Sequence, residues 1–525
     1  MNRSFNIFVA GAVLSTALLT SSCGDFLDTN VNPNNPISVP ARSILAQALK
    51  VTGDNLGSGY NSYAMWVAGY WGKSNTVNGF SEERTYNYTN LYQQGLWSTT
   101  YDNLKDYQLI IDQSAAENTP NLAAIARIMK VYNYQLLVDQ YGNIPYTSAL
   151  QGLGNISPQY DDALSIYRDL VLQLDQAVAT IDGLTSDIPL VGSEDIVFAG
   201  NMANWKRFAN TLKLRILLRM SGVTSQNDFI RAEVAKFPTT GAFTTTDVLI
   251  QPGFVQSTGK QNPFFNMYAL TAAGSNATQR NYVQPTVYII GQYKDNADPR
   301  LTRLYTAATT GANTGQYVGV QLGDENLLAV TNYSRNRVPG GLLKAFDMPQ
   351  PLLLLAESNF LQAEAKLTDE RRGNSAPYLA GGDAGAKTDY EAGIAASFTY
   401  FYAPAPSQRG TATDLSATAT TNYNTYLTAN TANPLVAWTA PGATTKLQKI
   451  YYQKYLALNG ADPIESWSEI RRNDYPNITP SLQSVSTRAD KLPVRLLYPQ
   501  SELITNTANV PAANQFTNRI FWDIK

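Results

Sequence analysis

Residues 161–181, DDALSIYRDLVLQLDQAVATI, carry the clearest helical pattern in the chain. Six apolar residues recur there at spacings of 4, 3, 4, 3 and 4, namely Ala163, Tyr167, Leu170, Leu174, Ala177 and Ile181. Such spacing places them on one face of a helix, which must be buried against a neighbour. Asp161 and Asp162 stand where an N-cap and a first-turn acid stabilise a helix. The stretch therefore predicts an amphipathic helix within a helical protein.

The same periodicity recurs on both sides of this stretch. Further helices are predicted at residues 43–51, 91–116, 120–141, 203–220, 350–367, 389–401, 445–458 and 463–472. The helix at 120–141 stops at Gly142, a plausible C-terminal glycine. Short connections favour antiparallel helix pairs, and in the first 220 residues these could stack as a tetratricopeptide-like array, although the strict repeat signature is absent. The predicted fold class is mainly α.

Two long excursions interrupt the helical pattern. Residues 237–345 mix β-prone pieces at 247–250 and 316–322 with Gly, Asn and Thr. Residues 403–445 are rich in Ala, Thr and Asn, and only Arg409 and Asp414 are charged. Loops of this length in a compact protein are usually functional or disordered. We therefore expect one helical domain over residues 41–525 that supports an irregular, loop-rich face.

The N-terminus has the three-part layout of a signal peptide. A short basic start ending at Arg3 precedes an uncharged, mostly apolar run at 5–20, two serines and Cys23. This run is too short for a membrane span. Cys23 is the only cysteine in the chain, and its thiol can carry a lipid that anchors the protein. Thr20 stands where the usual lipobox has Leu, so the motif is relaxed, and an ordinary secreted protein with an incidental cysteine is the alternative.

The N-terminal prediction therefore has three parts. Residues 1–22 form a signal peptide that is removed, and Cys23 is the lipid anchor to a membrane. Residues 23–40, rich in Asn and Pro, form an extended tether with turns.

The composition excludes several classes of function. The net charge is −2 and no basic cluster indicates nucleic-acid binding. The chain has no histidine, which removes Ser-His-Asp and Cys-His catalysis and His-based metal sites. We expect no cofactor and no metal. In contrast, 32 Tyr and 7 Trp are what a sugar- or peptide-binding protein needs, because aromatic faces stack on apolar C–H faces.

Aromatic residues gather on a loop rich in Gly and Asn around residues 66–92. They are Trp66, Tyr70, Trp71, Phe80, Tyr86, Tyr88 and Tyr92. One interpretation is a stacking platform for sugar rings or peptide side chains, with Arg84, Glu82 and Glu83 available to hydroxyls. The alternative is that Trp66 and Tyr70, four residues apart on a helix end, belong to the core. Trp97, Tyr101, Trp205, Phe208 and Trp467 are interpreted as packing residues.

Several carboxylates are candidates for catalytic groups. A glycoside hydrolase or lyase would use two carboxylates, and the candidates are Glu82 with Glu83, Glu357 with Glu364, and Glu465 with Glu469. The last two pairs each share one helix face, whereas catalytic pairs usually flank a cleft, and ion pairs with a neighbouring helix explain them as well. Lys206, Arg207, Lys213, Arg215 and Arg219 give one helix a basic face. A site for phosphate or an acidic substrate is one interpretation, and a solvated or salt-bridged face is the preferred one.

Several blocks of sequence occur in the order found in one family of proteins. They are Cys23-Gly24-Asp25-Phe26-Leu27-Asp28, the Asn-Pro run at 32–36, DQYGNIPY at 139–146, AGN at 199–201, WKRFANTLKLR at 205–215, DPRL at 298–301, AE at 356–357, AEA at 363–365, YEAGI at 390–394, WSEIRR at 467–472, and RLLYP at 495–499 with Glu502. With them the chain resembles the SusD/RagB family of nutrient-binding outer-membrane lipoproteins of Bacteroidetes-type bacteria. The departures are Asn143 and Asn201, where the family often has Asp.

The resemblance implies a fold and a function. It implies tetratricopeptide-like helix pairs that support an irregular ligand-binding face, on a protein at the cell surface. It implies capture of oligosaccharides, or in some members peptides, and delivery to a SusC-like TonB-dependent transporter. Family members commonly build the ligand site from two stretches, the second of which here holds Phe264, Phe265, Tyr268, Arg280, Asn281, Tyr282 and Tyr288.

The sequence therefore predicts a set of ligand-binding residues and leaves three functions open. The predicted residues are Trp66, Tyr70, Trp71, Arg84, Tyr86, Tyr88 and Tyr282. The preferred function is a surface lipoprotein that binds a glycan rather than a peptide and is not an enzyme. The alternatives are a surface-anchored helical hydrolase or lyase, and a protein that docks on the transporter without a ligand of its own.

Overall fold

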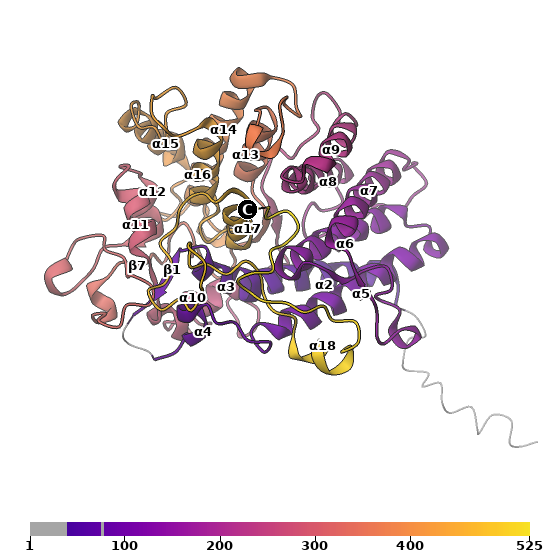
Figure 1. Ribbon diagram of the computed structural model, residues 1–525, viewed down its shortest axis with the longest axis horizontal. Helices are drawn as coiled ribbons and strands as arrows, with labels where there is room; N and C mark the ends of the chain where they lie inside the picture. The colour runs from indigo at the N-terminus through magenta and orange to yellow at the C-terminus, as the bar shows by residue number, and fades with distance from the viewer. Residues whose placement is uncertain (1–38, 75–77, 525) are drawn as a thin grey trace, which may run out of the picture.

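The computed structural model describes residues 39–74 and 78–524 (Figure 1). Within these ranges helices dominate, and strands occur only in short two-stranded pairs. The predicted signal peptide, Cys23 and the predicted tether up to residue 38 lie outside the described residues. The predicted fold class, mainly α, is confirmed.

The N-terminal half is a stack of long helices. It contains α2 (Ala41–Asp54), a π-helix (Asn55–Tyr60), α3 (Asn61–Val67), α4 (Ser81–Thr85), α5 (Gln94–Glu117), α6 (Pro120–Tyr141), α7 (Ala163–Asp182), α8 (Met202–Met220) and α9 (Asn227–Val234). Along the chain α5 packs on α6, α6 on α7 and α7 on α8, as expected for successive helix pairs. All six residues of the predicted α7 stripe are buried. Asp162 caps α7 by accepting a hydrogen bond from the Ser165 N–H at 2.9 Å.

The C-terminal half packs a second group of helices beside the first, as Figure 1 shows. The group contains α13 (Leu355–Ala365), α14 (Gly382–Tyr402), α15 (Ala419–Ala429), α16 (Lys446–Leu458) and α17 (Pro463–Asn473), whereas α18 (Gln500–Thr505) lies apart from it at the bottom of Figure 1. Helix α13 contacts α14, α16 and α8, and so joins the two halves. The α13–α14 contact depends on Gly393, because a Cβ there would lie 2.7 Å from the Phe360 ring.

Within the described residues, four short strand pairs link segments that are distant in the sequence. They are β1 (Trp71–Lys73) with β5 (Val283–Pro285), β2 (Ile144–Pro145) with β3 (Tyr160–Asp161), β4 (Val248–Ile250) with β8 (Gln350–Leu353), and β6 (Tyr305–Thr306) with β7 (Arg335–Asn336), all antiparallel. The predicted helix at 350–367 is wrong at its start, because β8 pairs with β4 and α13 begins only at Leu355. The Leu355 N–H donates to Asp247 Oδ1 at 2.8 Å, which helps to set that start.

The predicted excursions contain more structure than their composition indicates. Residues 237–345 hold α10 (Pro263–Tyr268), α11 (Val287–Lys294) and α12 (Arg300–Leu304) as well as strands, and residues 403–445 hold α15. The β-prone stretch at 316–322 forms no named strand and contributes only a bridge from Val320 to Thr286. No helix in the described part of the chain is both long and apolar enough to span a membrane.

The C-terminal segment crosses the front of the molecule in Figure 1 and binds the end of α6. The Leu496 N–H donates to the Gln140 carbonyl at 2.9 Å, and the Trp522 indole N–H donates to Asp139 at 3.0 Å. The Tyr498 hydroxyl donates to the Asn143 carbonyl at 2.7 Å. Gly142 ends α6 with φ of +76°, a left-handed conformation that glycine adopts without strain. The turn after α6 is therefore architectural.

Candidate functional site

Five of the seven residues predicted to bind ligand are buried. Trp66, Tyr70, Trp71, Tyr86 and Tyr88 expose at most 2% of their surface. Four of the five rings pack on other protein rings, with centroid distances of 4.6 Å from Tyr70 to Tyr455 and 4.4 Å from Tyr88 to Tyr92. Trp66 packs on Phe80 at 4.7 Å, and Trp71 is stacked on Phe264 at 5.9 Å. The predicted stacking platform is therefore wrong for these five residues. Their rings belong to the core and have no face open to a ligand.

The burial of this loop comes from segments far away in the chain. The Tyr70 hydroxyl donates to the Tyr455 carbonyl at 2.7 Å, and the Tyr88 N–H donates to Gln515 Oε1 at 2.9 Å. Desolvation raises the pKa of the Tyr70 hydroxyl well above its ordinary value, so it stays a proton donor. The alternative interpretation of Trp66 and Tyr70 as core residues is confirmed, as is the packing role of Trp97, Trp205, Phe208 and Trp467.

Arg84 and Tyr282 are the two predicted residues that remain partly exposed. Arg84 lies on α4, and its Nη1 donates to Gln483 Oε1 at 3.1 Å. Tyr282 follows a 3₁₀ turn (Thr278–Asn281), and its carbonyl accepts from the Ser74 N–H at 3.2 Å. In the second predicted stretch Phe264, Phe265 and Tyr268 are buried, whereas Arg280, Asn281 and Tyr288 are partly exposed. Ligand contact by Arg84 and Tyr282 stays a prediction.

Two of the three carboxylate pairs considered as catalytic groups, Glu357 with Glu364 and Glu465 with Glu469, are held in buried ion pairs. Glu357 accepts two hydrogen bonds from Arg215, at 2.7 and 2.8 Å. Glu364 and Glu469 both bind Arg472, at 2.7 and 2.8 Å, and Glu465 binds Arg219 at 2.5 Å. Lys454 lies 3.3–3.7 Å from Glu357, Glu465 and Glu469. Against the effect of burial, Arg472, Lys454 and Arg219 lower the pKa of Glu469 well below its usual range. These carboxylates stabilise the helix packing and have no space for a substrate beside them.

The basic face of α8 is salt-bridged, as predicted. Arg215 and Arg219 belong to the buried network, and Lys213 lies 2.5 Å from Asp175 and 2.7 Å from Glu233. Lys206 forms a partly exposed pair with Asp182 at 2.5 Å. No phosphate or acidic-ligand site is needed to explain this face.

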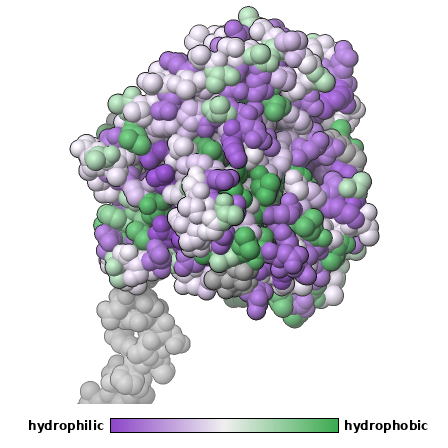
Figure 2. All heavy atoms as spheres, turned by 90° about the vertical axis from the view of Figure 1, so that its left-hand side faces the viewer, coloured by the Kyte–Doolittle hydropathy of each residue, from purple (hydrophilic) through white to green (hydrophobic). Residues whose placement is uncertain are grey.

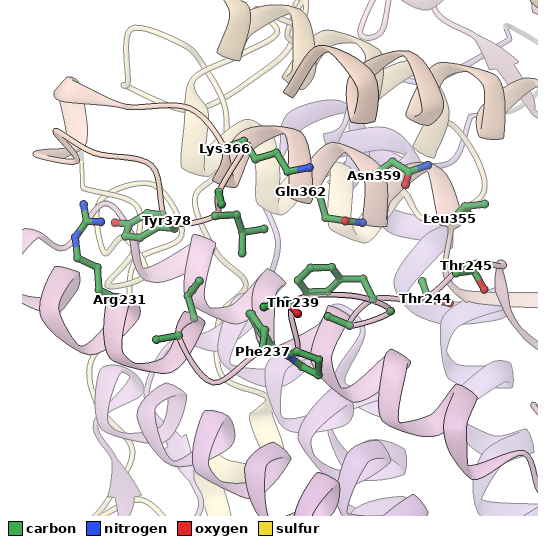
Figure 3. Close-up of a pocket in the computed structure, with 18 residues that line it drawn as sticks. Arg231, Phe237, Thr239, Thr244, Thr245, Leu355, Asn359, Gln362, Lys366 and Tyr378 are labelled. Atoms are coloured by element: carbon green, nitrogen blue, oxygen red, sulfur yellow. The ribbon is translucent and has the colours of Figure 1, made fainter. Parts of the chain in front are cut away.

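A surface pocket of about 830 Å³ lies between the end of α9 and helix α13 (Figure 3). We call it the α9–α13 pocket. The loop at 235–245 forms one wall, α13 forms the opposite wall, and residues 378–380 close one end. Its volume is in the range of pockets that hold small ligands. None of the seven predicted residues lines it.

Aromatic rings supply the apolar part of this pocket. Phe237 and Phe243 pack edge to face with centroids 5.1 Å apart, and both are partly exposed. They rest on a small core formed by Leu214, Leu218, Leu361 and Ala365. Tyr378 is held by Arg231, whose guanidinium lies 5.0 Å from the ring centroid. Burial raises the pKa of Tyr378 to about 12, so its hydroxyl is protonated and donates to Asn227 Oδ1 at 2.7 Å.

The rest of the pocket is lined mostly by neutral polar groups, together with Lys366, which forms an ion pair with Asp389. Asn359 and Gln362 lie on α13, and Figure 3 shows the Gln362 side chain reaching down into the pocket. Gln362 Nε2 donates to the Ser358 carbonyl at 3.2 Å, which leaves its Oε1 as an acceptor. Within the described residues the side chains of Asn359, Thr239 and Thr245 form no hydrogen bond with protein. An amide supplies both donors and an acceptor, so these groups can bind hydroxyls.

The sequence held a weak signal for this pocket. Residues 237–245, FPTTGAFTT, place two phenylalanines among Thr, Gly and Pro at the start of the predicted excursion. That pattern is typical of an aromatic loop that cannot bury itself in a helix stripe. The opposite wall, Asn359 and Gln362, is indistinguishable in the sequence from an ordinary solvated helix face.

The fold defines a class of protein, a scaffold of paired helices, and it carries a pocket lined by aromatic rings, amides, hydroxyls, Arg231 and Lys366. The family model SusD-like_2, described as "Starch-binding associating with outer membrane", matches residues 33–499, and the chain belongs to this family, SusD/RagB. The resemblance stated from the sequence is confirmed. No curated protein matches the sequence of this chain.

Solved structures show the same fold. A SusD-like protein from Bacteroides thetaiotaomicron VPI-5482 is 22% identical with a TM-score of 0.70, covering 93% of this chain and 99% of that one. A chitin-binding SusD homolog from Flavobacterium johnsoniae is 22% identical with a TM-score of 0.69, covering 92% and 98%. A SusD homolog from Bacteroides fragilis NCTC 9343 is 20% identical with a TM-score of 0.69, covering 93% and 99%.

Proposed function

We propose that this chain is a cell-surface lipoprotein that captures oligosaccharides and delivers them to a SusC-like TonB-dependent transporter. The α9–α13 pocket is the observation that carries the proposal of a glycan ligand. The family description names starch binding and an outer-membrane association, and one structural relative is described as chitin-binding. Peptides are the less favoured ligand.

The chemistry of the pocket matches a neutral sugar. A pyranose ring has apolar C–H faces, which pack on aromatic rings such as Phe237 and Phe243. Its hydroxyls need both donors and acceptors, which Asn359, Gln362 and Thr245 can supply. The side chains of Phe237 and Phe243 are held by edge-to-face packing, so little side-chain freedom is lost when a ligand binds.

Removal of the two amides tests this site. We expect Asn359→Ala/Gln362→Ala to weaken binding of the preferred oligosaccharide about tenfold or more, since each lost hydrogen bond contributes about 0.5–1.5 kcal/mol. Calorimetry against malto-oligosaccharides, chito-oligosaccharides and a panel of plant glycans measures it. Gln94→Ala, at the exposed first residue of α5, is the control and should bind as the wild type does.

The same variant distinguishes the alternatives. If Asn359→Ala/Gln362→Ala loses the glycan but still co-purifies with the transporter, the protein binds its own ligand and does not merely dock. Unchanged affinity would exclude the α9–α13 pocket as the glycan site. Release of reducing sugar by the wild type would support the hydrolase instead.

Loss of the proposed lipid anchor has a separate expected result. Cys23→Ala should lower the share of the protein in the outer-membrane fraction in cells that lack the transporter, because it removes the thiol that would carry the lipid. Fractionation followed by immunoblotting measures this, with Ser22→Ala as the matched control. Cys23→Ala protein that stays in the outer membrane of such cells would show that the lipid is not what holds it there.

A further inference from the structure

Strand β7 and helix α12 lie on the left of Figure 1, and this side of the molecule is turned to the viewer in Figure 2. Four arginines lie in these two elements or in segments next to them. Arg280 lies in the 3₁₀ turn before Tyr282, Arg335 in β7, Arg337 just after β7, and Arg303 in α12. We call them the arginine track. Figure 2 shows hydrophilic residues spread over this face between pale and hydrophobic ones.

The pairing of β6 with β7 sets where the side chains of Arg335 and Arg337 lie. Thr306 pairs with Arg335 in the β6–β7 ladder, and the Arg337 N–H extends the pairing by donating to the Leu304 carbonyl at 2.8 Å. Side chains two residues apart on a strand point to the same face, roughly 7 Å from each other. Arg335 and Arg337 are both partly exposed, while Asn336 between them is buried. The side chains of Arg335 and Arg337 therefore leave the chain on the same side, Arg335 toward Arg280 and Arg337 toward Arg303.

Neutral groups, rather than acids, hold the arginine track. Arg280 Nη1 donates to Asn276 Oδ1 at 2.7 Å, Arg335 Nη2 donates to Asn281 Oδ1 at 2.5 Å, and Arg303 Nε donates to the Phe401 carbonyl at 3.0 Å. In residues 39–74 and 78–524 no carboxylate oxygen lies within 4.0 Å of any of the four. Among the residues that the structure describes, the buried Nε atoms of Arg280, Arg335 and Arg337 have no hydrogen-bond partner.

Like charges lie close together along the track. Burial and the neighbouring Arg335 lower the pKa of Arg280. Burial also lowers the pKa of Arg303, and repulsion from Arg337 lowers it further. The nearby acids are otherwise engaged: Asp298 lies 2.6 Å from Arg300, and Asp414 accepts from the Gly410 and Ser416 N–H groups. Repulsion of this kind is relieved when an anion binds between the guanidinium groups.

A cavity of about 450 Å³ opens at the Arg303 end of the track. Arg303 and Arg337 line it together with hydroxyl and amide side chains, namely Thr302, Tyr402, Thr413, Thr418 and Asn422. Hydroxyls and amides beside cations suit a molecule that carries both hydroxyl groups and negative charge. An acidic glycan has this chemistry, whereas an acidic peptide offers few hydroxyls.

We propose that Arg280, Arg335, Arg337 and Arg303 form a binding track for glycans that bear carboxylate or sulfate groups. The inference rests on the proposed function, because it assigns a charge class to the glycan, and it uses a surface separate from the α9–α13 pocket. Arginine recognises both groups through paired, charge-assisted hydrogen bonds. The arginines position the charged substituents, and the cavity accepts the adjoining sugar.

Calorimetry with matched probes tests the track. Oligogalacturonate is compared with oligogalactose for the carboxylate arm, and dextran sulfate with dextran for the sulfate arm. We expect at least one anionic probe to bind at least tenfold more tightly than its neutral counterpart, with affinity that falls as salt rises. Arg335→Gln/Arg337→Gln should lose at least tenfold for that probe and change less than twofold for neutral glycans.

Two further variants keep the outcome decisive. Arg335→Lys/Arg337→Lys retains the charge and should recover part of the affinity. The control Arg371→Gln/Lys387→Gln removes the same charge at exposed sites paired with Asp369 and Glu391, and should bind as the wild type does. Circular dichroism and thermal melts show whether each variant is folded.

Three results would overturn the track. They are equal affinity of the wild type for anionic and neutral probes, unchanged affinity of folded Arg335→Gln/Arg337→Gln for the anionic probe, and polyglutamate binding as tight as that of the anionic glycans. The first two leave the proposed function standing if neutral glycans bind. If no glycan bound, whether neutral or anionic, the proposed function would be overturned as well.

Discussion

Arg215→Met is expected to lower the free energy of unfolding by about 3–5 kcal/mol, because the buried Glu357 loses both of its hydrogen bonds from Arg215 and keeps only Lys454, 3.7 Å away, as a counter-charge. The Glu357 side chain is fully buried, and Arg215 binds it through two hydrogen bonds at 2.7 and 2.8 Å. Arg215 also lies 3.8 Å from Asp462 and 3.9 Å from Glu465, so the substitution leaves several carboxylates to repel one another. Methionine fills a similar volume, which separates loss of charge from formation of a cavity.

The same helix offers a matched control. Lys206 on α8 forms an ion pair with Asp182, but the two side chains are 30% and 53% exposed. Lys206→Met should therefore cost at most about 1 kcal/mol. Urea unfolding followed by circular dichroism measures both variants. If Arg215→Met were as stable as Lys206→Met, the buried network would not be holding α8 against α13 and α17.

Stability is expected to rise with pH between about 7 and 10 because of one buried lysine. Burial lowers the pKa of Lys344 to about 7, with Asp247 opposing this effect and Arg303 adding to it. Its Nζ donates to the Tyr400 carbonyl at 2.6 Å and lies 4.2 Å from the Tyr400 ring centroid. A lysine in the unfolded chain has a pKa of about 10.4.

The sign follows from the protons bound in each state. Between these two pKa values the unfolded chain keeps a proton on Lys344 that the folded protein has released, so raising the pH favours the folded state. Below pH 7 both states are protonated and this contribution no longer changes with pH. The full gain is a few kcal/mol, since each tenfold difference in proton affinity between the two states corresponds to about 1.4 kcal/mol.

Comparison with a lysine-free variant isolates this effect. Urea unfolding at pH 6.5, 8.0 and 9.5 should show that Lys344→Met lacks the rise seen in the wild type, so the variant gains most at the lowest pH. Lys387→Met, at a site 46% exposed, should keep the wild-type slope. Parallel curves for Lys344→Met and the wild type would mean that Lys344 stays charged in the fold.

Local features of the sequence predict much of the scaffold. The helix predicted at 120–141 is α6 with the same bounds, and the stripe at 163–181 is the buried face of α7. Helical periodicity and end signals such as Asp162 and Gly142 act within a few residues, so they can be recognised without knowledge of the fold. The first residues of the helix predicted at 350–367 form strand β8 instead. Strand β8 pairs with β4, which lies about 100 residues earlier in the chain, so a local pattern cannot reveal the pairing.

The sites depended on contacts between distant segments. Trp71 and Tyr88 have the residue types of a sugar-binding loop, and only the rings and chain segments that cover them show that they are core. The α9–α13 pocket joins residues 237–245 to Asn359 and Gln362, and the arginine track joins Arg280 to Arg335.

By itself, then, the sequence determined the helical class and, through its ordered blocks, the family. The lipoprotein signal at Cys23 remains a prediction. Only the tertiary structure decided which aromatic rings and charges face solvent. The physical reason is that a side chain's residue type sets what it can bind, whereas its exposure depends on neighbours that the chain brings from hundreds of residues away, as Tyr455 covers Tyr70 and Gln515 binds Tyr88.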